Sequence, residues 1–264
     1  MASSSLFGAL IDLVLPRTCA GCGVPGRILC RPCAALFAAP RAAAPRRFPW
    51  GFPPTAAAGA YTGPVRPVVN AFKEQGRTEL DRPLGAALAL AVAAVVSAVP
   101  GDHRPVLLVP VPSSAAAMRA RGRDHVRELT TRAVAELCAA GMPAAEARLL
   151  RRRGRVRDSA GLSAAARRAN LAGTFQRTSP PAPGSLVVLV DDVVTSGATL
   201  TEAAAALAAG ARPGHPPVLA AVVAATPRRM AGVTSRSDLR VAPERSGNVP
   251  HAPVGRLSGP GWKD

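Results

Sequence analysis

Apolar runs and helical patterns alternate along the middle of the chain. Residues 186–190 and 218–225 are uninterrupted apolar runs rich in Val, Leu and Ala, as is typical of strands covered on both faces of a parallel sheet. Shorter runs predict two further strands over residues 56–61 and 106–111. The alternation predicts an α/β fold in which helices flank a parallel sheet. Helical patterns occupy residues 64–74, 84–99, 123–140 and 199–210.

Composition divides the chain into four parts. Residues 1–38 hold four cysteines and predict a small zinc-binding module, whereas the α/β pattern occupies residues 55–227. Between them, residues 39–54 are rich in Pro, Ala and Arg and predict a poorly ordered linker. Residues 228–264 combine Gly, Pro, Ser and Arg with little apolar periodicity, and we expect a disordered tail there.

The apolar stretches do not predict a membrane span. Residues 84–99 are too short to cross a bilayer, and Asp81 and Arg82 precede them closely. Residues 6–15 are apolar like part of a signal peptide, but Asp12 interrupts them and no cleavage site follows. We therefore expect a cytoplasmic protein.

The charge balance favours polyanionic partners. The chain has 33 Lys and Arg residues against 16 Asp and Glu residues, a net charge of +17 at pH 7. Such an excess attracts nucleotides, pyrophosphate compounds or nucleic acid. A solvated basic surface is the alternative, and charge alone does not distinguish the two.

Four of the five cysteines form two Cys-x-x-Cys pairs, Cys19 with Cys22 and Cys30 with Cys33. Four thiolates fill the tetrahedral shell of a structural zinc ion. Because no export signal is predicted, metal binding is favoured over disulfides. The fifth, Cys138, lies in an Ala-rich helical stretch, and we expect it to be a small buried residue.

The most informative stretch is residues 186–200, where an apolar run ends in Asp191 and Asp192. Ligands bind just beyond the carboxyl ends of strands in open α/β sheets, and paired carboxylates there can hydrogen-bond the two hydroxyls of a ribose, directly or alongside a metal ion. The alternative is that the acidic and hydroxyl side chains merely cap the next helix. The turn that follows offers backbone N–H groups and hydroxyls at a helix N-terminus, which suits a phosphate; it consists of Thr195, Ser196, Gly197, Ala198 and Thr199.

A second candidate binding loop ends the strand predicted over residues 106–111. Two prolines stiffen it, and we expect the N–H groups of Val111, Ser113 and Ser114 to point outward, as suits a loop that holds a pyrophosphate. A rigid strand-to-helix turn would have the same sequence. The loop consists of Val109, Pro110, Val111 and Pro112.

Basic residues follow this loop and recur later. Arg119, Arg121 and Arg123 can neutralise phosphate charge. Residues 148–157 contain six arginines and predict either a mobile basic lid or a solvated basic helix.

No residue stands out as a dedicated general base. His103 and His125 are isolated in the sequence, and we expect both at the surface. For Lys73, taken alone, we also expect an exposed position at the surface.

Taken in order, these pieces resemble the ComF family of phosphoribosyltransferase-like proteins. The stretch at 186–200 by itself resembles the signature with which type I phosphoribosyltransferases bind 5-phosphoribosyl-1-pyrophosphate (PRPP), and the resemblance as a whole spans residues 6–226. The motifs that carry it are Pro16 to Cys33, Tyr61-Thr62-Gly63 with Lys73, Val109 to Pro112, Arg119 to Gly122, Leu162 to Leu171 and Val190 to Gly197.

The resemblance implies a type I phosphoribosyltransferase-like sheet and a PRPP site. Asp191 and Asp192 would hold the ribose hydroxyls, residues 195–199 the 5′-phosphate, and residues 109–112 the pyrophosphate with Mg²⁺. Lys73 and Arg121 belong to the same implied PRPP-binding set.

Two departures from the family pattern concern other polar groups. The family usually follows Arg-Gly with an aromatic residue and then Asn-Gln, where this chain has Arg123, Asp124 and His125. A Gln near Ser159 is also absent. The phosphate-binding motifs are intact.

The implied function is a phosphoribosyltransferase with an unknown acceptor, in a family linked to DNA uptake during natural transformation. One alternative is a single-stranded-DNA-binding protein that keeps a non-catalytic PRPP pocket, which the charge supports and the few aromatic residues disfavour. Another is a partner-docking protein that uses the zinc module for contact.

Overall fold

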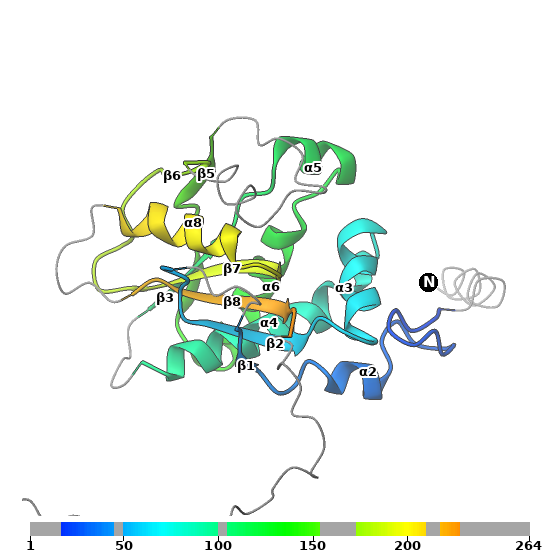
Figure 1. Ribbon diagram of the computed structural model, residues 1–264. Coiled ribbons are helices and arrows are strands. Elements are labelled where there is room, and N and C mark those ends of the chain that lie inside the picture. Colours follow the sequence, from blue (N-terminus) through cyan, green and yellow to red (C-terminus); the bar gives the residue numbers. More distant parts are fainter. Residues whose placement is uncertain (1–16, 45–49, 100–104, 154–172, 210–216, 228–264) are drawn as a thin grey trace, which may run out of the picture. The chain divides into compact units, whose positions relative to one another are not determined.

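A mostly parallel, six-stranded sheet forms the centre of the protein (Figure 1). The computed structural model describes residues 17–44, 50–99, 105–153, 173–209 and 217–227. The strand order is β1-β2-β8-β7-β3-β4, and all neighbours are parallel except β1 and β2. The strands are β1 (Arg41–Ala42), β2 (Thr55–Ala60), β3 (Val106–Pro110), β4 (Ala144–Glu146), β7 (Leu186–Val194) and β8 (Leu219–Ala225). The predicted α/β class and parallel sheet are confirmed.

Helices cover both faces of this sheet (Figure 1). One face packs against α3 (Val65–Glu74), α4 (Asp81–Ser97) and α6 (His125–Ala139). The other face packs against α8 (Ala198–Ala208) and a small antiparallel hairpin. The hairpin strands are β5 (Leu150–Arg152) and β6 (Phe175–Arg177), and the short helices are α2 (Arg31–Ala35), η1 (Thr78–Leu80) and α5 (Ala115–Arg121).

The central strand β7 shows how its sequence fits two covered faces. Successive side chains of a strand point to opposite sides of the sheet. Val188 and Val190 accordingly pack in the core under α4 and α6, whereas Val187 and Leu189 pack in the core under α8. An uninterrupted apolar run is therefore required here, because both alternating sets are buried.

The strand β7 is longer than predicted. It continues past Val190 through both aspartates, because β8 extends far enough to pair with Asp191, Val193 and Val194. The two aspartates therefore lie within the last part of the strand and not just beyond it.

The segment predicted to be a poorly ordered linker is partly built into the fold. Arg41 and Ala42 form β1 along the edge of β2, and the N–H of Ala43 donates to the carbonyl of Thr55 at 2.8 Å. The side chains of Ala43 and Phe52 are buried. The expectation of poor order was wrong at these positions, because the free edge of β2 offers backbone partners and apolar surface that composition alone does not reveal.

The apolar helix predicted over residues 84–99 begins earlier than expected. Together with η1 it spans Thr78–Ser97, and among the described residues this is the one stretch long and apolar enough to cross a membrane. The most apolar part of this stretch is 56% buried inside the protein, and α4 packs on β2 and β8. The helix therefore has the character of a core helix.

The close approach of α4 and α6 depends on Gly85. A Cβ atom built at this position would lie 2.5 Å from Cβ of Arg132 on α6, and closer still to its Cγ. Arg132 also donates from Nη2 to Asp81 Oδ2 at 2.9 Å, at the start of α4. The small residue thus permits a helix contact that the ion pair reinforces.

Cys138 is exposed, contrary to the prediction that it is buried. It lies near the end of α6, where its thiol reaches the carbonyl of Ala144 at 3.3 Å. An Ala-rich helix does not specify which of its faces meets the sheet. His103, the 228–264 tail and residues 154–157 of the arginine-rich segment lie outside the described residues.

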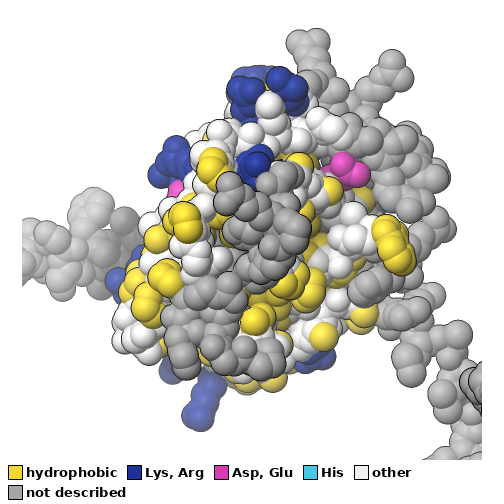
Figure 2. All heavy atoms as spheres, turned by 90° about the vertical axis from the view of Figure 1, so that its left-hand side faces the viewer, with side chains coloured by type: hydrophobic (Ala, Val, Ile, Leu, Met, Phe, Trp, Pro, Cys, Tyr) yellow, Lys and Arg dark blue, Asp and Glu magenta, His cyan; other side chains and the backbone are white. Residues whose placement is uncertain are grey.

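Basic side chains are spread over the surface. Figure 2, which shows the left-hand side of Figure 1, has Lys and Arg side chains at several separate places on this face and few acidic ones. On this face the positive charge is not gathered into a single patch.

Candidate functional site

A pocket of about 240 Å³ opens beside the carboxyl ends of β3 and β7. Segments far apart in the sequence supply its lining, which is predominantly polar. Its principal residues are Lys73 of α3, Val111 to Ser114 after β3, Arg121 of α5, His125 of α6, Arg152 of β5, Asp191 and Asp192 of β7, and Thr199 of α8. The fold therefore brings together seven of the predicted ligand-binding residues: Lys73, Val111, Pro112, Arg121, Asp191, Asp192 and Thr199.

Asp192 is almost fully buried, with 4% of its surface exposed, and both of its oxygens are engaged. Its Oδ2 lies 2.7 Å from Lys73 Nζ and 2.9 Å from His125 Nε2. Its Oδ1 accepts the backbone N–H of Val193 at 2.6 Å. This carboxylate is held on one side by α3 and on the other by α6.

These contacts keep the buried pair charged. Burial by itself would raise the pKa of Asp192, but the hydrogen bond from His125 and the charge of Lys73 outweigh it, so that the pKa is lowered. Burial would likewise lower the pKa of Lys73, but the charge of Asp192 outweighs it and the pKa of Lys73 is raised. Lys73 is thus part of an internal ion pair, which the sequence pattern of a surface charge did not indicate.

His125 is a buried residue of the site and not an isolated surface residue as predicted. It is 2% exposed and begins α6, directly after Asp124, whose side chain caps the helix by accepting the N–H of Arg127. Its Nδ1 lies 3.4 Å from Nη1 of Arg121. Because a guanidinium can only donate, Nδ1 must be the acceptor and Nε2 carries the hydrogen that points to Asp192.

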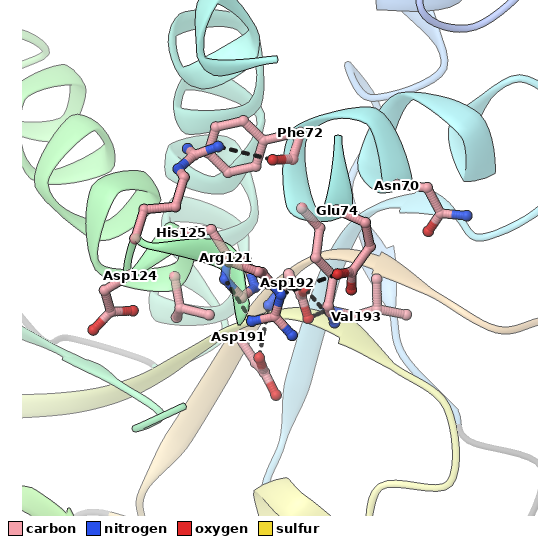
Figure 3. A network of polar contacts seen from close by, with 12 residues as sticks. Asn70, Phe72, Glu74, Arg121, Asp124, His125, Asp191, Asp192 and Val193 are labelled. Atoms are coloured by element: carbon pink, nitrogen blue, oxygen red, sulfur yellow. Dashed lines mark hydrogen bonds and ion pairs between the residues drawn. The ribbon is translucent and has the colours of Figure 1, made fainter. Parts of the chain in front are cut away.

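Asp191 has a different environment from its neighbour. Figure 3 shows its carboxylate directed away from that of Asp192, as expected for adjacent residues of one strand. Within the part of the chain that the structure describes, the hydrogen-bond donor to this carboxylate is the backbone N–H of Asp192, at 2.9 Å. Burial, together with the negative charge of Asp192, raises the pKa of Asp191 to about 8. Among the described residues, Asp191 is therefore the carboxylate with acceptor positions left for a ligand.

Arg121 links the pocket to α3. Its Nε donates to Glu74 Oε2 at 3.0 Å, while its Nη1 reaches His125 (Figure 3). The neighbouring Arg123 turns away, donating to the carbonyl of Phe72 and to Glu128. Arg119 is exposed and does not line the pocket. Only the middle arginine of the predicted trio thus reaches the site.

Arg152, from the arginine-rich segment, also lines the pocket. Its Nε is buried without a hydrogen-bond partner in the described structure, and its guanidinium lies 5.4 Å from the ring of Phe175. Burial lowers the pKa of Arg152, and the charge of Asp191 opposes that effect. An unsatisfied buried N–H is costly, and an anion bound beside it would relieve the cost. The arginine run was the sequence signal for this residue, but it did not single out which member reaches the pocket.

The turn before α8 has no side-chain cap. Gly197 occupies the N-cap position with a φ of 78°, a left-handed conformation that favours glycine, and no side-chain cap accepts a hydrogen bond from the first N–H groups of the helix. The alternative that these polar residues merely cap the helix is therefore wrong. Thr199 lines the pocket, whereas Thr195 is exposed, Ala198 is buried, and neither they nor Ser196 and Gly197 line it.

The loop after β3 differs from its prediction at its first residue. The N–H of Val111 donates to the carbonyl of Val190 at 2.9 Å, and so it continues the sheet and is not free for a ligand. Ser114 caps α5 by accepting the N–H of Ala117 at 3.1 Å. Val109 is a fully buried core residue and Pro110 pairs with Val190, so neither lines the pocket.

The four paired cysteines form a second candidate site. Their sulfur atoms all lie within 4.8 Å of one another, and Cys30 Sγ lies 3.5 Å from the sulfurs of both Cys19 and Cys22. Four thiolates around one zinc ion are separated by roughly 3.8 Å, given Zn–S bonds of about 2.3 Å. The cluster, which Cys33 completes, can therefore bind a metal ion such as zinc.

Backbone N–H groups stabilise negative charge on a sulfur of the cysteine cluster. Burial would raise the pKa of Cys19, but backbone N–H groups, among them those of Cys30 and Gly21, outweigh it and lower the pKa to about 6. Burial, together with the neighbouring sulfurs, raises the pKa of Cys33. Cys33 therefore does not ionise readily by itself, and a bound cation would supply the compensating charge.

The cysteine module is packed onto α3. A Cβ atom at Gly21 would lie 2.8 Å from the sulfur of Cys33 and 3.2 Å from Cβ of Pro64, the residue that precedes α3. Arg77 donates to the carbonyl of Thr18 at 3.0 Å. The module therefore contacts the residue before α3 and a residue that follows it.

Comparison with known proteins does not identify a family for this chain. No protein-family model matches the chain, and no curated protein matches it.

Proposed function

We propose that this protein binds PRPP and is a phosphoribosyltransferase-like protein of the ComF type. The observation that carries the proposal is that Asp191 and Thr199, at the start of α8, line the same pocket. In the part of the chain that the structure describes, Asp191 accepts a hydrogen bond only from a backbone N–H, which leaves acceptor positions for a ligand. The pocket lies at the carboxyl end of parallel strands, the usual place for ligands in α/β sheets. Three cationic side chains, Lys73, Arg121 and Arg152, face the same space.

Each part of PRPP has a chemically suitable partner. Asp191 would accept hydrogen bonds from the ribose hydroxyls, and the N-terminal turn of α8 with Thr199 would bind the 5′-phosphate. The pyrophosphate would lie against residues 112–114, where Arg121 and Arg152 supply positive charge. Mg²⁺ would enter with the pyrophosphate, with Asp191 as a carboxylate ligand, and would supply charge neutralisation for the leaving group.

The proposed reaction is transfer of the phosphoribosyl group. Pyrophosphate leaves C1 of the ribose and an acceptor nucleophile adds there. The chain would contribute by orienting the sugar and by stabilising the negative charge that develops on the leaving group, since the pocket offers cations and backbone donors. His125 donates to Asp192 and is not free to act as a general base, so the acceptor would bring its own nucleophile.

For the cysteine cluster we propose structural zinc. Four sulfur ligands leave no open coordination position, which is the arrangement of structural and not of catalytic zinc sites. The ion would hold the module in the shape that packs against α3.

Isothermal titration calorimetry with PRPP and Mg²⁺ tests the proposal. We expect saturable heat with the wild-type protein and a loss of affinity of about tenfold or more in the Asp191→Asn variant. Ribose 5-phosphate and pyrophosphate titrated separately report the two halves of the site. Absence of heat with PRPP in the folded wild-type protein overturns the proposal.

A second candidate is binding of single-stranded DNA by a cytoplasmic protein of DNA uptake. The net charge of +17 and the basic side chains spread over the surface support it. A gel shift measured at increasing salt tests it: DNA binding should weaken steeply as salt rises, and retention independent of salt excludes it. A docking role for the cysteine module predicts partner capture that depends on the four cysteines and not on Asp191.

A further inference from the structure

One carboxylate oxygen of Asp192 is shared by two side-chain donors. Oδ2 faces two donors at once, Lys73 Nζ at 2.7 Å and His125 Nε2 at 2.9 Å. The backbone N–H of Val193 serves only Oδ1, and a buried Oδ2 left without any donor is destabilised, so at least one of the two must stay. The two donors differ in how firmly the surrounding structure holds them.

His125 is the fixed donor. It is 2% exposed, its position at the start of α6 is set by the cap at Asp124, and its other ring nitrogen accepts from Arg121. The imidazole thus has partners on both nitrogens, and turning it would break both contacts.

Lys73 is the donor that is able to leave. Its side chain is 28% exposed against 3% for that of His125, and it lies in the last turn of α3 on a flexible four-carbon stem. The same ammonium lines the pocket, beside Arg121 and the loop residues after β3. A rotation of the lysine side chain is therefore sufficient to move its charge from Asp192 toward an anion in the pocket.

We propose that Lys73 is an exchangeable cation, held by Asp192 in the free protein and transferred to a phosphate oxygen of the ligand on binding. His125 is the positioning residue that permits this exchange, because its hydrogen bond keeps Asp192 satisfied after Lys73 has left. The two carboxylates then have unequal roles, with Asp191 facing the ligand and Asp192 serving as an internal anchor. The identity of the physiological anion as PRPP rests on the proposed function, whereas the exchange requires only a phosphate or pyrophosphate group.

The exchange has a direct spectroscopic signature. The chain contains two lysines, Lys73 and Lys263, so lysine labelled with a heavy nitrogen isotope at Nζ gives two side-chain signals by nuclear magnetic resonance. Inorganic pyrophosphate with Mg²⁺ is the probe. We expect it to shift the Lys73 signal and to leave that of Lys263, the internal control, much less changed.

Substitutions in the folded full-length protein distinguish Lys73 bound to Asp192 from Lys73 bound to the ligand. Asp192→Asn should move the Lys73 signal of the free protein but not that of the pyrophosphate-saturated protein, because the lysine then contacts the ligand. His125→Phe should hold Lys73 on Asp192 and weaken pyrophosphate binding by about tenfold or more. His125→Gln retains a donor and should restore both the shift and the affinity. Circular dichroism confirms that each variant is folded.

The outcomes separate this inference from the proposed function. If pyrophosphate or PRPP binds by calorimetry while the Lys73 signal stays at its free position, the exchange is wrong and PRPP binding is unaffected. If pyrophosphate shifts Lys73 but PRPP produces no heat, the exchange holds and the proposed function fails. If neither ligand binds, both are wrong, and equal weakening by His125→Phe and His125→Gln also overturns the role given to His125.

Discussion

Asp191 and Asp192 are neighbours in β7, yet their carboxylates lie on opposite sides of the sheet and have opposite electrostatic surroundings. Asp192 lies between a lysine and a histidine, whereas Asp191 has a single backbone donor in the described structure. The two adjacent aspartates therefore have opposite pKa shifts: the pKa of Asp192 is lowered and that of Asp191 is raised. The same substitution at the two positions should therefore have opposite effects on stability.

Asp191→Asn should stabilise the free protein at alkaline pH. Because the pKa of Asp191 is raised to about 8, the folded state holds a proton that the unfolded state, with a pKa of about 3.9, has lost. Wild-type stability therefore falls as pH rises between these two values. In urea unfolding without added Mg²⁺, the free energy of unfolding of the variant should increase relative to that of the wild type between about pH 5 and about pH 9. A pH-independent difference would contradict the shift.

Asp192→Asn should destabilise the protein near neutral pH. Its lowered pKa contributes stability that is present above the unfolded value of about 3.9 and is lost as pH falls below it. The loss at pH 7 should be about 2 kcal/mol, the scale of a hydrogen bond to a charged group, and it should shrink toward about pH 3 in the same unfolding experiment. An unchanged free energy of unfolding at neutral pH would mean that the contacts with Lys73 and His125 contribute nothing net.

Arg152→Gln should weaken PRPP binding by about tenfold, because the guanidinium lines the pocket and its Nε has no hydrogen-bond partner among the described residues. The matched control is its exposed neighbour Arg151, whose Nε instead donates to Gln176 at 2.9 Å. Calorimetry on Arg151→Gln should give nearly the wild-type affinity. Equal losses in both variants would indicate a general charge effect in place of a specific contact.

The folded protein should contain one zinc ion per chain, and Cys22→Ser should lose it together with thermal stability. The control is Cys138→Ser, because Cys138 is exposed and lies outside the cluster. Elemental analysis and thermal unfolding, each with and without a zinc chelator, measure the effect. Retention of metal by Cys22→Ser would exclude the four-sulfur site.

Gly85→Ala should lower the free energy of unfolding by about 1–3 kcal/mol, the cost of overpacking a close helix contact. Helix propensity alone predicts the reverse, a gain of about 1 kcal/mol on replacing Gly by Ala inside a helix. The sign of the change in urea unfolding thus decides whether the contact between Gly85 and Arg132 controls the packing of α4 on α6.

The sequence was sufficient for the elements whose pattern repeats locally. β7 and β8 were predicted because both of their faces are apolar, and α3, α4, α6 and α8 because each has a helical pattern. The short pieces β1, β4, β5 and β6 were missed, since their strand character comes from a neighbouring edge and not from their own residues. The cysteine cluster was predictable because its spacing is itself the geometry of a metal site.

By itself, the sequence determined the α/β class, the cysteine cluster and the acidic end of β7, because these depend on residue types at short spacing. Tertiary structure alone decided which side chains meet: His125 and Lys73 joined Asp192, Arg152 but not Arg119 reached the pocket, and Asp191 separated from its neighbour. Those contacts join residues from different helices and strands. The partners, burial and charge state of these side chains depend on how distant segments pack together, and the local sequence pattern does not predict them.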